Sequence, residues 1–131
     1  MHLRIHEPES RLPSTATKAL LLAGRLLEKK ALDLLALDLS GEQLLYEAAL
    51  IATASSPRHA KGLADFLLEE CRRERFACLH LEGYAAAQWI LLDLNDLVIH
   101  IFQQPIRDLY RLEDLWPAVP VLADHREKKS P

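Results

Sequence analysis

The sequence predicts a single α/β domain in which a mixed β-sheet of about five strands is flanked by α-helices. Three observations support this fold class. Residues 57–75 have the apolar spacing of an amphipathic helix, residues 88–102 alternate like a β-hairpin, and short apolar segments typical of strands precede each of them. The chain has 131 residues, which is long enough to bury one hydrophobic core.

The first helix is expected to begin near Ser14, because Ser14 and the threonines that follow it offer side-chain oxygens for an N-cap. Its apolar pattern continues to about Lys30. Residues 1–13, which contain two prolines, are expected to be a flexible N-terminal segment outside the domain.

The next two segments are less clear. ALDLLALDLS, at 31–40, is short, apolar and followed by glycine, which favours an interior strand, although its leucines also suit a continuation of the first helix. EAALIATA, at 47–54, is ambiguous because its alanines favour a helix while its shortness and its flanks favour a strand.

A second helix is expected from Pro57 to about Arg75. Ser56 can cap it, and proline suits the first helical position because its missing N–H has no partner there in any case. The apolar residues then follow helical spacing along one stripe: Ala60, Leu63, Ala64, Leu67, Leu68 and Cys71.

Residues 88–102 (QWILLDLNDLVIHIF) predict a hairpin around Asn95-Asp96, since both residue types tolerate positive φ. This turn places Trp89 opposite Phe102, Leu91 opposite His100, and Asp93 opposite Val98. One face is expected to be core: Ile90, Leu92, Leu94, Leu97, Ile99 and Ile101. The other face, called here the hairpin face, carries Trp89, Leu91, Asp93, Val98, His100 and Phe102. It is either a surface for a partner or a face covered by a helix of the same chain.

Between the second helix and the hairpin, residues 76–81 read as a strand and Glu82-Gly83 as a turn. Short helical turns are expected after Pro105 and at 112–116. Residues 118–131, which follow Pro117 and end in charged residues, are expected to be a flexible C-terminal tail.

Composition limits the function classes. A net charge of −3 argues against a protein that coats nucleic-acid duplexes. The two cysteines form neither a zinc pattern nor a disulfide framework, which favours reduced thiols in a cytoplasmic protein. No window reaches the roughly twenty apolar residues of a membrane-spanning helix, and the N-terminal residues do not resemble a secretory leader.

A catalytic site is only weakly indicated. His80, Glu82, Asp93, Asp96 and His100 include ligand types suited to a transition metal, and a metal-dependent hydrolase or nucleotidyltransferase-like enzyme using Asp93, Asp96 and His100 is the alternative function. No metal-binding spacing supports it, and no nucleophile elbow or glycine-rich phosphate loop occurs. We therefore expect neither catalysis nor a cofactor, a metal or a small-molecule substrate.

The spacing of several unusual residues resembles one known family, the ribosomal silencing factors, also called the RsfS or Iojap family. The resemblance covers roughly residues 18–116 and includes Thr53–Arg58 and Glu82-Gly83. It is carried mainly by this series: Trp89, Asp93, Asp96, His100, Phe102, Arg107, Tyr110, Leu112, Glu113, Leu115 and Trp116. The chain departs from the family where Ala54 and Asn95 replace glycine and where Glu47-Ala48-Ala49 replaces Asp-Tyr-Phe.

The resemblance implies a silencing-factor domain at 14–117 that acts without enzymatic activity. Such a protein binds the large ribosomal subunit through ribosomal protein L14 on the intersubunit face. It thereby obstructs joining of the small subunit and lowers translation when nutrients are short. A homodimer away from the ribosome is also expected, through the exposed apolar strip of the hairpin face.

The residues expected to bind the partner are Glu82, Trp89, Asp93, Asp96, His100, Tyr110 and Glu113. Trp89 would supply apolar area at the centre, and exposed carboxylates would favour a basic partner that is embedded in ribosomal RNA. Arg107 is expected to pair with a carboxylate of its own chain. Leu112 and Leu115, with Tyr110 beside them, are expected to pack the last turns onto the sheet.

Overall fold

The computed structural model describes residues 13–42 and 44–127 of the chain. The helices and strands follow in this order: α2 (Thr15–Glu28), β1 (Leu32–Asp38), η2 (Ser40–Glu42), β2 (Ala48–Ala54), α3 (Pro57–Glu74), β3 (His80–Glu82), β4 (Trp89–Asp93), β5 (Leu97–Gln103), α4 (Gln104–Tyr110), η3 (Leu112–Leu115) and β6 (Val121–Asp124). This confirms the predicted α/β class.

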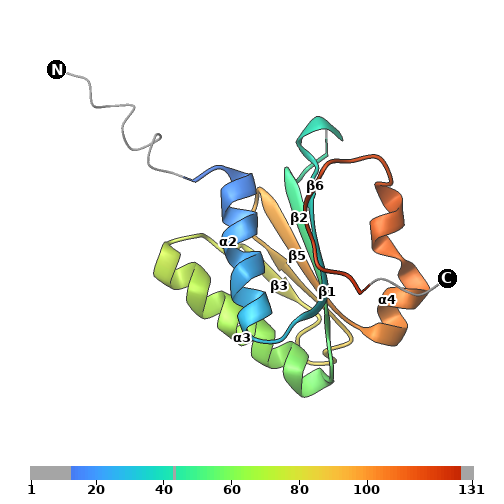
Figure 1. Cartoon of the computed structure of the whole chain (residues 1–131). Helices are drawn as coiled ribbons and strands as arrows, with labels where there is room; N and C mark the ends of the chain where they lie inside the picture. The colour runs from blue at the N-terminus through green and yellow to red at the C-terminus, as the bar shows by residue number, and fades with distance from the viewer. Residues whose placement is uncertain (1–12, 43, 128–131) are drawn as a thin grey trace.

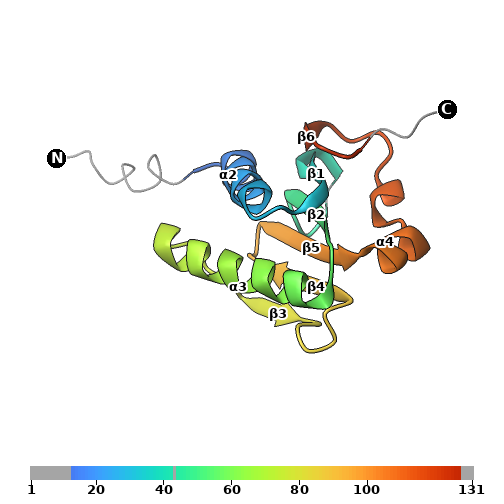
Figure 2. The ribbon, with the colours of Figure 1, turned by 60° about the horizontal axis from the view of Figure 1, so that its bottom comes forward.

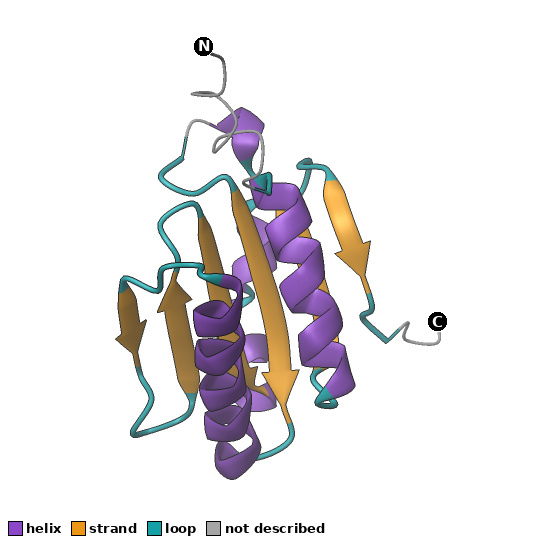
Figure 3. Cartoon of the chain, turned by 90° about the vertical axis from the view of Figure 1, so that its left-hand side faces the viewer, coloured by secondary structure: helices purple, strands orange, loops and turns teal. Residues whose placement is uncertain are grey.

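One mixed sheet of six strands organises these elements, in the order β3-β4-β5-β2-β1-β6. Only β2 and β5 run parallel to each other; the other neighbouring pairs are antiparallel. Helices α2 and α3 cover one face of the sheet, and α4 lies on the other (Figure 1). Viewed from the side of α2 and α3, β3 and β6 form the two edges of the sheet (Figure 3).

Both long helices begin where their caps predict. The Ser14 hydroxyl accepts a hydrogen bond from the Thr17 N–H at 3.1 Å, and the Ser56 hydroxyl accepts one from the His59 N–H at 3.0 Å. The predicted apolar stripe of α3 is buried, and Cys71 at its end is a free thiol in the core. Burial raises the pKa of this thiol to about 11, which makes it unreactive at neutral pH.

The two ambiguous segments are both strands. Every residue of β2 is buried, because β1 and β5 flank it and helices cover both faces around it. A central strand of this kind shows no alternation between apolar and polar residues, which is why its local sequence could not be distinguished from a buried helix.

The hairpin has the predicted register. Trp89 pairs with Phe102, Leu91 with His100, and Asp93 with Val98. The Leu94 N–H donates to the Leu97 carbonyl at 2.8 Å, and Asn95 takes a φ of 78°, so the turn contains the two predicted residues. The predicted core face is fully buried beneath α2 and α3.

Two expectations differ from the structure. Of the strand expected at 76–81, only His80 and Leu81 lie in β3, which also takes in Glu82, expected in the turn. The expected tail contains β6, whose Ala123 pairs with Ala36 of β1. Leu122 and Ala123 also pack against the core. The segment becomes a strand only because β1 offers it a free edge, which no local pattern reveals. Residues 1–12 and 128–131, also expected to be flexible, lie outside the described residues.

No helix in the described part of the chain is both long enough and apolar enough to cross a membrane.

Candidate functional site

The hairpin face is half covered by its own chain. Val98 and Phe102 on β5 are buried, and Ile106 of α4, together with Leu112 and Trp116, packs against this side of the sheet. Figure 2 shows α4 beside the end of β5. Trp89, Leu91 and Asp93 on β4 remain half-exposed. The sequence left open whether a helix or a partner covers this face, and the structure places α4 over β5 while β4 stays accessible.

An aromatic cluster joins β4 to α4. The Trp89 ring lies 4.8 Å from the Phe102 ring and 5.1 Å from the Tyr110 ring, measured between centroids. Phe102 is completely buried, whereas Tyr110 is 58% exposed. Trp89 therefore connects the buried Phe102 to the exposed Tyr110, with both neighbouring rings tilted against its own.

His100 holds the Trp89 ring through a hydrogen bond. The Trp89 Nε1–H donates to His100 Nδ1 at 3.0 Å, so this nitrogen is unprotonated and the neutral ring carries its proton on Nε2. His100 is only 7% exposed, and burial lowers its pKa to about 4. The structure thus gives this predicted partner-binding residue an internal role, in orienting the tryptophan.

The folded protein is expected to lose stability below neutral pH, because His100 binds a proton more readily in the unfolded chain. The pKa falls from 6.5 in the unfolded chain to about 4 in the folded protein, so only the unfolded chain binds a proton between these values. The neutral His100 ring therefore contributes to the free energy of unfolding in full above the unfolded pKa. This stabilisation is lost as the pH falls, by about 2 kcal/mol between pH 6.5 and pH 5. Urea unfolding near pH 7 and pH 5 should show this loss in the wild type and not in His100→Gln. An equal loss in both proteins would contradict the role of this ring.

The carboxylates of the hairpin take different positions. Asp93 accepts from the Tyr46 hydroxyl at 2.9 Å and from the Asn95 N–H at 2.8 Å, so it stabilises the turn while staying half-exposed. Glu82 is exposed at the edge and lies 3.4 Å from His80 on the same side of β3, as the strand pattern predicts. Among the predicted acidic residues, Glu82 is therefore the one with the most solvent-exposed carboxylate.

Asp96 points to α2 instead. It accepts from the Thr15 hydroxyl at 2.6 Å and from the Lys18 ammonium at 2.8 Å. Burial opposes ionisation of Asp96, but the hydrogen bonds from Lys18 and Thr15 outweigh it and lower the pKa of its carboxyl. Asp96 thus anchors the first helix to the hairpin turn.

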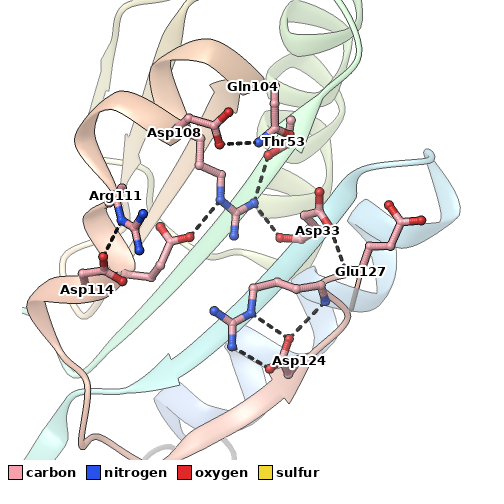
Figure 4. Close-up of polar contacts among 11 residues, drawn as sticks. Asp33, Thr53, Gln104, Asp108, Arg111, Asp114, Asp124 and Glu127 are labelled. Atoms are coloured by element: carbon pink, nitrogen blue, oxygen red, sulfur yellow. Dashed lines mark hydrogen bonds and ion pairs between the residues drawn. The ribbon is translucent and has the colours of Figure 1, made fainter. Parts of the chain in front are cut away.

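Glu113 also has an internal partner. It lies 3.2 Å from Arg107, confirming the expected pairing of this arginine within its own chain. Arg107 is buried, and its Nη1 donates to the Asp33 carbonyl at 2.6 Å and to the Thr53 hydroxyl at 2.9 Å (Figure 4). These contacts fasten α4 and η3 to β2 and to the start of β1.

Helices α4 and η3 expose more apolar side chains than the sequence indicates. Leu109, beside Tyr110 on α4, is 71% exposed, and Leu115, at the end of η3, is 65% exposed. Leu115 was expected to pack on the sheet; only Leu112 does so. A seven-residue helix is too short for its apolar pattern to show which side is buried. We call Trp89, Leu109, Tyr110 and Leu115 the α4 patch.

The alternative enzyme site is not assembled. His100 contacts Trp89, whereas Asp96 contacts Thr15 and Lys18. Among residues 13–42 and 44–127, no three His, Cys, Asp or Glu side chains form a group that could hold a metal ion. The proposed cluster of Asp93, Asp96 and His100 thus gives way to three separate structural roles.

Comparison with known proteins shows the family of this chain. Residues 12–131 match the family described as "Ribosomal silencing factor during starvation". The ribosomal silencing factor RsfS of Bacillus subtilis is 35% identical over 97 residues, which span 74% of this chain and 81% of that protein. A more distant relative from Mus musculus, named "Mitochondrial assembly of ribosomal large subunit protein 1", is 26% identical over 101 residues, spanning 73% of this chain and 43% of its own.

Solved structures show that the fold is also similar. A crystal structure of a protein from Chromobacterium violaceum has a TM-score of 0.75 and 27% identity, covering 89% of this chain and 92% of that one. The family match includes residues 117–131, where the sequence alone showed no resemblance, and therefore takes in β6. From its sequence, its aromatic series and its fold, this chain belongs to the family of ribosomal silencing factors.

Proposed function

We propose that this protein binds the large ribosomal subunit in the cytoplasm through ribosomal protein L14 on the intersubunit face. Bound there, it blocks the approach of the small subunit and represses translation when nutrients are limited. The observation that carries the proposal is the α4 patch, in which the Trp89 and Tyr110 rings contact each other at an angle of 51° and Leu109 and Leu115 are exposed. Aromatic residues held rigid at a surface are the usual anchors of protein interfaces.

The charges around the α4 patch suit a basic partner. Glu82 is exposed on the neighbouring edge strand, and Asp93 is half-exposed on β4. Acidic groups at the rim of an interface speed the encounter with a positively charged surface and orient it. In this proposal, Glu82, Asp93, Trp89 and Tyr110 contact the partner, while His100, Asp96 and Glu113 hold the contacting residues in place.

The mechanism requires no chemical step. A protein that covers part of the intersubunit face prevents joining by occupying space, so its effect depends on affinity and position alone. The mouse relative is named for assembly of the ribosomal large subunit, which supports the choice of subunit.

Removing two exposed side chains of the α4 patch should weaken binding while leaving the fold intact. We expect Leu109→Ala combined with Tyr110→Ala to weaken binding to isolated large subunits at least tenfold, because an interface anchor contributes about 2 kcal/mol or more. Sucrose-gradient co-sedimentation with separated subunits measures this. Leu20→Ala is the matched control, since Leu20 is an exposed leucine on α2, which lies across the sheet from α4.

Two results would contradict the proposal. Wild-type protein that stays at the top of the gradient does not bind the large subunit. A patch variant that binds as tightly as the wild type would show that the interface does not include α4. A subunit-joining assay then tests the second step, in which bound wild-type protein should prevent formation of the complete ribosome.

A further inference from the structure

A basic pocket lies at the junction of α2 and α3, away from the α4 patch. It has a volume of about 530 Å³ and is lined mainly by Lys29, Lys30, Ser55, Ser56, Arg58 and His59. Its two walls come from segments that are well separated in the sequence, so the fold alone creates it.

His59 holds these two walls together. Its Nδ1 accepts from the Ser55 N–H at 2.9 Å, and its Nε2 donates to the Lys29 carbonyl at 2.9 Å. The ring therefore joins the end of α2 to the start of α3. Lys30 and Arg58 therefore extend from a backbone that is held in place, which lowers the entropy lost when they bind a ligand. The Lys29 ammonium lies over the Phe66 ring, 4.9 Å from its centroid.

The charge of the pocket is strongly one-sided. Lys29, Lys30 and Arg58 are exposed, and within the described residues none of them forms an ion pair. The residues lining the pocket include no aspartate or glutamate. Such a group of cations attracts an anion with several negative oxygens, of which phosphate is the common biological example.

The pocket lies at the same end of the sheet as the start of α4. Ala54, just before Ser55, pairs with Gln103, which immediately precedes α4. The starts of α3 and α4 both lie toward this lower end of the sheet in Figure 1, on opposite faces. A large partner that covers the α4 patch can therefore reach the pocket around one end of the molecule.

We propose that this pocket binds backbone phosphates of ribosomal RNA when the protein docks on the large subunit. The inference rests on the proposed function, which brings the chain to a protein surrounded by RNA. Contacts to phosphates position a protein without reading the base sequence. The net charge of −3 argues against a protein that coats a nucleic-acid duplex, but it is compatible with one local cationic site that contacts a few phosphates.

The lining favours an RNA backbone over a free nucleotide. Leu32 is the one apolar residue among those lining the pocket, and none of them is a phenylalanine, tyrosine or tryptophan on which a base could stack. No carboxylate is present to accept from ribose hydroxyls. The pocket therefore offers groups for phosphate and none for a nucleoside.

The salt dependence of subunit binding tests this inference. We expect Lys30→Gln combined with Arg58→Gln to lower affinity for isolated large subunits about tenfold near 0.1 M KCl. The slope of log affinity against log salt should also fall by about 1.5, since each phosphate contact contributes about 0.7–0.9. The matched control is Arg72→Gln with Arg75→Gln, which removes the same charge at the far end of α3. Equal affinities and slopes for the two variants would overturn the inference, and they would leave the α4 interface untouched.

A second measurement does not depend on subunit binding. Titrating the isotope-labelled protein with a short RNA hairpin at low salt should shift the amide resonances of Lys30, Ser55 and Arg58, and the pocket variant should lose these shifts. Unchanged resonances at these positions overturn the inference, as do equal shifts with ATP or with a poly-glutamate peptide. If these shifts appear but the wild-type protein does not co-sediment with large subunits, the proposed docking is refuted. Binding of phosphate by the pocket is then still supported.

Discussion

Arg107→Met is expected to lower the free energy of unfolding by about 3–5 kcal/mol, because it removes one partner of a buried ion pair. Arg107 is 4% exposed, and its guanidinium contacts Glu113, the Asp33 carbonyl and the Thr53 hydroxyl. Without it, Glu113 loses its ion-pair partner and α4 loses its attachment to β2. Urea unfolding followed by circular dichroism measures the loss.

Replacing both partners should restore much of this stability. Arg107 Nη2 and Glu113 Oε1 are buried without a hydrogen-bond partner in the described structure, so part of the cost of burying this pair is not recovered. We therefore expect Arg107→Met with Glu113→Leu to be more stable than Arg107→Met alone. The exposed pair Arg111–Asp114 in the same segment is the control, and Arg111→Gln should leave stability nearly unchanged. A small effect of Arg107→Met, similar to that of Arg111→Gln, would show that α4 does not depend on the buried pair.

Gly83→Ala is expected to destabilise the protein by more than about 3 kcal/mol, through backbone strain combined with a steric clash. Gly83 has a φ of 78°, and a Cβ atom there would lie 2.0 Å from the Trp89 carbonyl oxygen. Because the clash is with backbone, the turn between β3 and β4 must move. The variant should therefore also weaken binding to the large subunit, since Trp89 begins β4 and forms part of the α4 patch.

Gly62→Ala is the matched control with the opposite expected sign. A Cβ atom at Gly62 meets nothing within 4 Å, and this residue lies inside α3. Alanine in the middle of an exposed helix should stabilise the protein by about 1 kcal/mol. Thermal unfolding of both variants measures the difference, and a Gly83→Ala protein as stable as the wild type would show that the turn can relax without cost.

The sequence by itself determined those features that depend on neighbouring residues. The caps at Ser14 and Ser56 and the register of the hairpin follow from local chemistry and from the two-residue period of a strand, and the structure confirms them. The aromatic series around Trp89 also pointed to one face of the hairpin, where the structure places Trp89 beside Tyr110.

Only the tertiary structure decided which carboxylates are free. Asp96 pairs with Lys18, and Glu113 pairs with the buried Arg107; in the sequence both carboxylates look like exposed acidic residues beside a candidate interface. The sequence gives the charge of each group, whereas its partner depends on which elements the fold brings together. For this reason three of the seven residues predicted to bind a partner, Asp96, His100 and Glu113, are engaged by side chains of their own chain in the structure.

The same reason explains β6 and the basic pocket. The four residues of β6 become a strand because β1 leaves an unpaired edge, and the pocket forms because His59 joins Lys29 to Ser55. Pairing across a sheet and contact between helix ends join residues far apart in the chain, so no local pattern encodes them. The sequence determined the elements and the family of this protein, and the packing of those elements decided its exposed surfaces.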